Sequence, residues 1–180
     1  MLIDIAIWVQ NLGVFADLRS SAYAYPVLLS LHLVGLGMFG GMILVTDVRI
    51  LGWAMRGFTI ADVIKSTRWF KRIGLVFTAG CGFLLFCSKA EAYAYNAFFQ
   101  VKLTLFALVI VHALIFRGSV YNKPDEIEGN PSLLSRARTA AALSLLLWTC
   151  IMICGRGIGY LNSPAGLHFA ELLGRLKNAL

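Results

Sequence analysis

Residues 23–46 read YAYPVLLSLHLVGLGMFGGMILVT and contain no Asp, Glu, Lys or Arg. An α-helix rises about 1.5 Å per residue, so about 20 apolar residues cross the roughly 30 Å hydrocarbon core of a bilayer. This stretch is therefore predicted to be a transmembrane helix. Three further segments, at about 73–90, 96–116 and 138–160, have the same character.

The composition of the whole chain agrees with a membrane protein. Of its 180 residues, 59% are hydrophobic and only 14% are charged, and the mean hydropathy is +0.76. Soluble domains carry about 25% charged residues. We therefore expect one all-α integral membrane domain over residues 1–180, a four-transmembrane-helix bundle in the lipid bilayer. The net charge of +7 does not indicate nucleic-acid binding, because no basic surface with interleaved aromatic residues is visible.

The basic residues predict how the bundle is oriented. Ten of the sixteen Lys and Arg lie in the connections after the first and third spans. These ten are Arg49, Arg56, Lys65, Arg68, Lys71, Arg72, Arg117, Lys123, Arg136 and Arg138. Basic loops stay in the cytoplasm, so both connections are predicted to be cytoplasmic and both termini to lie outside. Asp47 and Arg49 are expected to anchor the cytoplasmic end of the first span.

Two segments outside the spans have the pattern of helices that lie on the membrane surface. Residues 2–18 lack the basic start of a cleavable signal peptide and carry Asp4 and Asp17 among apolar residues. Residues 164–179 have a polar stripe opposite an apolar face. Both are predicted to be interfacial amphipathic helices.

The tetrapeptide AYAY occurs twice, at Ala22–Tyr25 and Ala92–Tyr95, each time at the start of an apolar run. The first and third spans are predicted to run in the same direction, so both copies are expected at the outer interface, where Tyr is enriched. His32 and Lys102 each follow the first Tyr of a copy by nine residues. Both are therefore expected about 14 Å deeper, at one common level.

Ionisable side chains inside a membrane are candidates for function by default. His32, Lys102 and Arg156 are predicted to form one polar layer in the outer half of the bundle, if their helices turn these residues inward. Such a layer suits a haem b or a quinone, and Arg156 could bind a carboxylate, a haem propionate or a lipid headgroup. The alternative for Lys102 is that its ammonium reaches outward to the interface.

Two histidines on two helices also suggest a haem held by a histidine pair, or a metal site, with His32 and His112 as ligands. His112 lies ten residues beyond Lys102, hence about 15 Å deeper, which disfavours a single haem between the two histidines. The alternative for His112 is a hydrogen bond across the bundle. Copper is a further possibility, since Met38 and Met42 offer soft thioethers on the helix that carries His32.

Other chemistry is scarce in this sequence. The four cysteines, Cys81, Cys87, Cys150 and Cys154, all fall within spans and are expected to be buried thiols. There is no phosphate-binding loop, Ser-His-Asp set or HEXXH motif. The centres of the four spans lack acidic residues, which argues against a carboxylate-driven pump or cation transporter.

Three stretches carry a resemblance to a known group of proteins: LHLVGLGMFGGMILVTDVRILG (31–52), NAFFQVKLTL (96–105) and LLLWTCIMICGRGIGY (145–160). Over about residues 23–160 the chain resembles an uncharacterised family of small bacterial four-helix membrane proteins, itself distantly similar to the membrane domain of the copper-resistance protein CopD. The resemblance rests on His32, Asn96, Lys102, Trp148, Gly155 and Arg156; His112 is not part of it. It implies the bacterial inner membrane and no established activity, and the likeness to CopD suggests copper handling.

Three functions remain open at this point. The chain could be a haem- or quinone-binding subunit that serves electron transfer in a larger membrane complex. It could be a non-catalytic structural or assembly subunit, partnered by other membrane proteins or by copies of itself. It could bind or transport copper in the manner of CopD. The short connections and the absence of catalytic motifs favour an accessory subunit over a self-sufficient enzyme.

Overall fold

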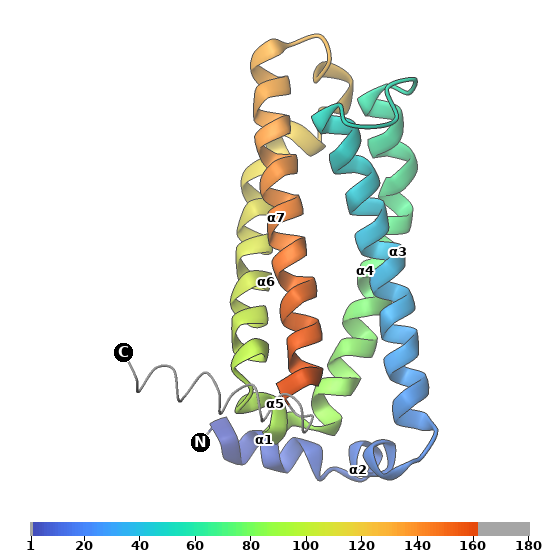
Figure 1. The fold of residues 1–180 in the computed structure, drawn as a ribbon, viewed down its shortest axis with the longest axis vertical. Coiled ribbons are helices and arrows are strands. Elements are labelled where there is room, and N and C mark those ends of the chain that lie inside the picture. Colours follow the sequence, from blue (N-terminus) through green and yellow to red (C-terminus); the bar gives the residue numbers. More distant parts are fainter. Residues whose placement is uncertain (1, 162–180) are drawn as a thin grey trace.

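The computed structural model describes residues 2–161, and the helix predicted for 164–179 lies outside the described residues (Figure 1). The described chain is all-α. Four helices run along its length: α3 (Ala24–Leu51), α4 (Ile60–Ser88), α6 (Ala97–Phe116) and α7 (Pro131–Leu161). Each is long and apolar enough to cross a membrane. The predicted four-helix membrane fold is confirmed, and the protein is a multi-pass membrane protein.

Shorter elements cover the two ends of the bundle. At one end, here called the N-terminal end, lie α1 (Leu2–Gln10), α2 (Gly13–Ser20) and α5 (Ala90–Ala94). At the other, the loop end, lie residues 52–59, the π-helical turn η1 (Arg117–Tyr121) and the 3-10 turn η2 (Pro124–Glu126). The single helix predicted for residues 2–18 is in fact two, α1 and α2, which lie across the N-terminal end of the bundle (Figure 1).

The long helices extend beyond the predicted apolar spans at the loop end. The first continues to Leu51, the second begins at Ile60 instead of about 73, and the fourth begins at Pro131 instead of about 138. Local signals set these ends. The Thr59 side chain accepts a hydrogen bond from the Asp62 N–H and caps α4, and Gly52 ends α3 with a φ of 77°. Hydropathy alone finds only the part of a helix that matches lipid.

Glycines bring α3 and α4 into close contact. A Cβ placed on Gly74 would lie 3.0–3.1 Å from atoms of Phe39, including its backbone, and one on Gly35 would lie 2.7 Å from the Thr78 hydroxyl. Small residues allow membrane helices to approach in this way. The other close pairs are α6 with α7 and α3 with α7, whereas α4 and α6 hardly approach each other. The bundle is therefore two helix pairs joined through α3 and α7.

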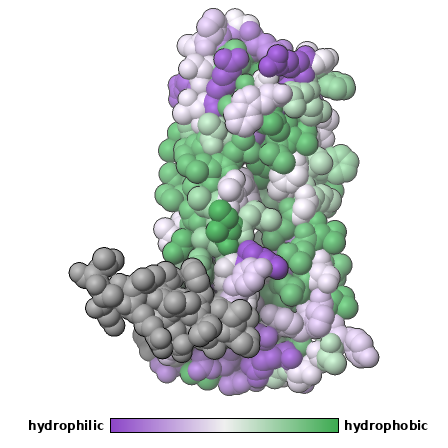
Figure 2. Space-filling model, viewed as in Figure 1, coloured by the Kyte–Doolittle hydropathy of each residue, from purple (hydrophilic) through white to green (hydrophobic). Residues whose placement is uncertain are grey.

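The loop end has a core like that of a soluble protein. Its buried members are Ile50, Ile60, Ile64, Val120, Ile127, Ala137 and Ala141. The two connections above it are tied together by Arg49, which pairs with Glu128 at 2.6 Å. Glu128 also accepts a hydrogen bond from the Ile60 N–H at 3.0 Å. On the face shown in Figure 2, an apolar belt lies between two more polar ends of the molecule.

The N-terminal end is held by polar and aromatic contacts. Gln10 of α1 donates to the Glu91 carboxylate at 2.8 Å and accepts from the Glu91 backbone N–H at 3.1 Å. Tyr93 stacks on Phe86 and Phe99, with ring centroids 6.4 and 5.3 Å away. α1 and α5 are thereby fixed against the ends of α4 and α6.

Candidate functional site

His32 lies on α3, half-buried against α4. Its Nδ1 is 3.0 Å from the backbone oxygen of Thr78, and a Cβ on Gly82 would lie 2.9 Å from its Cε1. Because a carbonyl oxygen only accepts, Nδ1 carries the proton and the neutral ring keeps a lone pair on Nε2. Nε2 makes no hydrogen bond to any residue in the described chain. The ring is thus held in one orientation with one nitrogen available.

Lys102 lies on α6, half-buried against α7. Its ammonium lies 5.7 Å from the Phe106 ring centroid, within cation–π range, and 3.6 Å from the position of a Cβ on Gly155. Within residues 2–161 the ammonium donates no hydrogen bond. The positive charge of Lys102 acts electrostatically on His32. That His32 and Lys102 act together in one site stays a prediction.

Arg156 differs from His32 and Lys102 in that it is exposed. Its guanidinium lies 4.9 Å from the centroid of the Tyr160 ring and donates to the Tyr160 hydroxyl at 3.3 Å. The sequence placed Arg156 at the right end of the bundle but could not fix which way its side chain points. In this structure Arg156 faces outward, in a position to meet a lipid headgroup.

His112 is buried near the loop end of α6. Its Nε2 lies 3.0 Å from the backbone oxygen of Ala140 on α7, and its ring packs on Phe116 with centroids 4.9 Å apart. This contact is the cross-bundle hydrogen bond named above as the alternative for this residue. The nitrogen that would bind iron is used by the protein, and His32 contacts α4 in the other half of the bundle. A haem held by His32 and His112 does not fit these residues.

Metal-binding side chains are dispersed. Among the described residues, no group of three His, Cys, Asp or Glu side chains is close enough to hold a metal ion. Cys81, Cys87 and Cys154 are buried free thiols and Cys150 is half-buried. Of the two predicted metal ligands, His32 and His112, His32 is the one whose Nε2 makes no hydrogen bond in the described chain, while its Nδ1 is held by a backbone carbonyl.

A second polar cluster, which the sequence pattern did not reveal, lies toward the loop end between α3, α4 and α7. Asp47 was predicted to anchor the end of the first span at the membrane surface. Instead it is buried, with 2% of its surface exposed. Ser144 on α7 lies within hydrogen-bonding reach of its carboxylate, and Lys71 on α4 acts on it electrostatically. The signal that could have found this cluster is the helical spacing of Thr67 and Lys71, which puts both on one face of α4.

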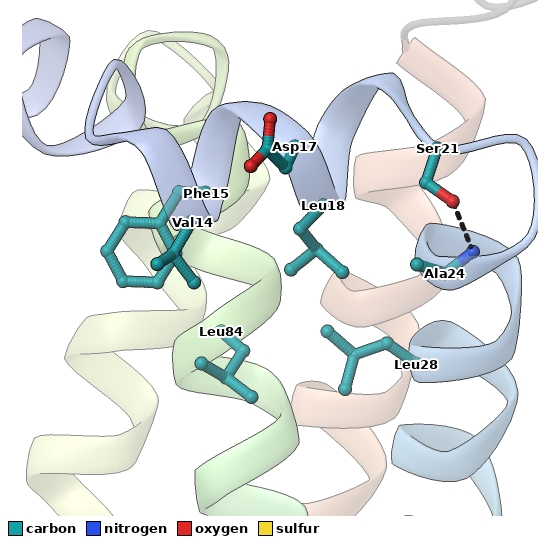
Figure 3. A pocket seen from close by; sticks show the side chains of 8 residues that line it. All are labelled: Val14, Phe15, Asp17, Leu18, Ser21, Ala24, Leu28 and Leu84. Carbon is teal, nitrogen blue, oxygen red and sulfur yellow. Dashed lines mark hydrogen bonds between the residues drawn. The ribbon is translucent and has the colours of Figure 1, made fainter.

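An apolar groove of about 480 Å³ opens beneath α2, against α3 and α4 (Figure 3). It is lined by Val14, Phe15, Asp17, Leu18, Ser21, Ala24, Leu28 and Leu84. None of the predicted site residues lines this groove. Its apolar walls match lipid chains, so it is not the candidate site.

Comparison with known proteins places the chain in a family. Residues 9–161 match the model of a family of unknown function, DUF6644. The chain belongs to this family. No curated protein and no solved structure matches it. The DUF6644 match covers all four membrane helices and both polar clusters, and it assigns a role to neither.

Proposed function

We propose that this DUF6644 protein is a small membrane subunit that binds a quinone between His32 and Lys102 and serves electron transfer within a larger membrane complex. The observation that supports this is a pair of half-buried polar groups, the His32 Nε2 and the Lys102 ammonium, neither of which has a hydrogen-bond partner in the described chain. Polar groups inside a membrane are normally satisfied, so a pair left open points to a ligand.

The chemistry of the pair matches the two ends of a quinone's redox cycle. The Lys102 ammonium donates hydrogen bonds and suits a carbonyl oxygen. The His32 Nε2 accepts, and so suits the hydroxyl of the reduced form and can hold its proton. A bound quinone supplies two-electron, two-proton chemistry that the side chains lack. The Thr78 carbonyl fixes the imidazole so that Nε2 stays the accepting nitrogen.

The arrangement of helices also supports a lipid-soluble ligand. α4 and α6 hardly approach each other, and His32 and Lys102 lie on α3 and α6, packed toward α4 and α7 respectively. The seam between α4 and α6 is therefore not closed by a tight helix–helix contact. A ligand dissolved in the lipid would reach the pair through this seam.

Binding of a short-tailed ubiquinone analogue, decylubiquinone, to the protein in lipid nanodiscs tests this proposal. Trp148 packs near Phe106, which lies under Lys102, so quenching of tryptophan fluorescence reports occupancy. Loss of a hydrogen bond from a charged group costs about 1.5–3 kcal/mol, so Lys102→Met should weaken binding about tenfold or more. His32→Leu should weaken it as well.

Lys89→Met is the matched control, because Lys89 lies over the Tyr25 ring, outside the proposed pocket. It should bind like the wild type. Equal affinity in the wild type, Lys102→Met and His32→Leu would exclude this pocket. Absorption spectra of protein from cells grown with a haem precursor report any haem that is bound by ligands other than the pair His32 and His112.

Copper binding is the second candidate and is the expectation from the distant likeness to CopD. It is favoured by the open His32 Nε2 and by Met38 and Met42, both half-buried on the same helix. Stoichiometric copper in the purified protein, lost in His32→Leu but kept in His112→Leu, would support it. If neither quinone nor copper binds, a structural or assembly subunit, in a hetero- or homo-oligomer, is the remaining function, and a native pull-down would identify its partners.

The proposed location is the bacterial inner membrane, with the loop end in the cytoplasm and the N-terminal end outside. The ten basic residues that favour this orientation lie on the loop-end side of the bundle. Single cysteines at Gly57 and Ala22, in a background without the native cysteines, test it in intact cells. A membrane-impermeant maleimide should label Ala22→Cys and spare Gly57→Cys; the reverse pattern would invert the topology.

A further inference from the structure

Asp47 presents an unsatisfied oxygen in a buried place. It lies about one turn before the end of α3, with 2% of its surface exposed, and its Oδ2 has no hydrogen-bond partner. Burying an unpaired carboxylate is costly, and such a group normally finds a partner or loses its charge. The site proposed for quinone does not use Asp47, which is fifteen residues from His32 on the same helix.

The nearest opposite charge does not directly neutralise Asp47. The Lys71 ammonium donates to the Thr46 hydroxyl at 2.9 Å, and this hydroxyl lies 3.0 Å from that of Thr67. The charges of Lys71 and Asp47 attract each other, but the two side chains form no direct ion pair in the described chain. A carboxylate and an ammonium thus share one buried space across a gap lined by hydroxyl groups.

The other groups facing this space are few. Arg68, one turn before Lys71 on α4, adds a repelling positive charge. Ser144 approaches Asp47 from α7, and Tyr121 approaches it from η1. Lys71 is the cation that acts on the carboxylate, and its positive charge would repel a metal ion placed beside it. A proton moving between the carboxylate and the amine adds no net charge.

From this geometry we infer that Asp47 and Lys71 form a proton-exchange site that takes up and releases a proton at the loop end. In one state the pair holds one proton, which lies on Lys71 while Asp47 is ionised, or on Asp47 while Lys71 is a neutral amine. In the other state a second proton, taken up from water at the loop end, leaves Asp47 neutral and Lys71 charged, and its release to water restores the first state. The Thr46 hydroxyl accepts from Lys71 and the Ser144 hydroxyl reaches Asp47, so each member of the pair keeps a hydroxyl partner in either state.

The route to water that this inference requires is assigned to Tyr121, which is near enough to Asp47 for the two to interact electrostatically. This residue is half-buried at the end of η1, and the exposed Arg68 donates to its backbone oxygen at 3.2 Å. π-helical turns recur at functional sites, and here the turn brings Tyr121 and Val120 over the bundle. The apolar loop-end core closes the rest of this end. Asp47 is therefore one side chain away from the solvent at the loop end.

Labelling with dicyclohexylcarbodiimide tests the inference, because this apolar reagent modifies protonated carboxyls within membranes. The protein in nanodiscs is labelled across a pH series, and modified peptides are located by mass spectrometry. Asp47 should be modified in acidic buffer, with labelling falling about tenfold per pH unit once the carboxyl ionises. Lys71→Met removes the charge that favours the carboxylate, so labelling should persist into more alkaline buffer.

Lys65→Met is the matched control, because Lys65 lies on α4 but is exposed and pairs with Asp125. It should keep the wild-type profile. Infrared titration gives a second readout, a protonated-carboxyl C=O band of the wild-type protein that disappears as pH rises and is absent in Asp47→Asn. A wild-type protein with neither pH-dependent labelling of Asp47 nor a titrating band would overturn the inference, whatever the result for quinone.

Discussion

The hydroxyl groups of Tyr25 and Tyr93 lie 3.2 Å apart, although 68 residues separate them in the chain. One belongs to the first AYAY tetrapeptide and the other to the second. The two copies therefore lie at the same end of the bundle and also touch. The contact joins the start of α3 to α5. Each tyrosine has a second partner at this end of the bundle: Lys89 lies over the Tyr25 ring, and Phe86 stacks on Tyr93.

Removing either hydroxyl should destabilise the fold modestly. A hydrogen bond contributes about 0.5–1.5 kcal/mol, so Tyr25→Phe and Tyr93→Phe should each lower the free energy of unfolding by that amount. The double variant should lose little more than either single one, because both break the same bond. Tyr95→Phe, at an exposed tyrosine, is the control. Thermal unfolding in detergent measures all four; additive losses would show that the two hydroxyls are independent.

Two half-buried tyrosines outside the spans make the protein sensitive to alkali. Burial raises the pKa of Tyr121, as does the nearby Asp47, and burial together with the Tyr25 hydrogen bond raises that of Tyr93. In the unfolded chain these tyrosines ionise near pH 10, at a lower pH than in the folded protein. The free energy of unfolding should therefore fall as pH rises above about 10.

The check is the melting temperature as a function of pH. Tyr121→Phe should show a shallower fall above about pH 10 than the wild type. Tyr23→Phe, which removes an exposed phenol, should keep the wild-type slope. Identical slopes in all three proteins would mean that the Tyr121 phenol is not protected by folding.

The α3–α4 contact should not tolerate a larger residue at Gly74. The added methyl of Gly74→Ala would lie 3.1 Å from the backbone of Phe39, which cannot rotate away, so the two helices must separate. Overpacking of this kind costs about 1–3 kcal/mol. Gly40→Ala is the control, because its Cβ would meet nothing within 4 Å.

In the control, the better helix propensity of Ala should stabilise α3 by up to about 1 kcal/mol. Melting temperatures in one detergent compare the two variants, which should shift in opposite directions. A Gly74→Ala protein as stable as Gly40→Ala would mean that α3 and α4 are not in close contact in the membrane.

His112 is expected to contribute stability and no ligand binding. His112→Leu removes the hydrogen bond to the Ala140 backbone oxygen and should cost about 1 kcal/mol in unfolding free energy. Quinone affinity should stay at the wild-type value, because His112 lies in the other half of the bundle from His32. Fluorescence titration and thermal unfolding on one preparation separate these effects. A variant of normal stability that fails to bind would return His112 to the site.

The sequence alone determined the four membrane helices. Hydrocarbon excludes charged residues over a fixed thickness, so the apolar runs around 23–46, 73–90, 96–116 and 138–160 had to be read as spans. It also determined that the two AYAY copies share one end, because spans one and three run in the same direction. The constant rise of a helix predicts that His32 and Lys102 lie at one level, and this stays a prediction.

Only the tertiary structure decided which side chains meet. In helices that are apolar on nearly every face, the pattern of residues does not fix their rotation. The sequence therefore left open whether Arg156 turns inward and whether His112 binds a ligand or forms a hydrogen bond across the bundle. Asp47 looked like an anchor because it ends an apolar run. It is buried because α4, α7 and η1 continue past the lipid-matched stretch and cover it, and that extension depends on caps and packing, which a hydropathy profile does not register.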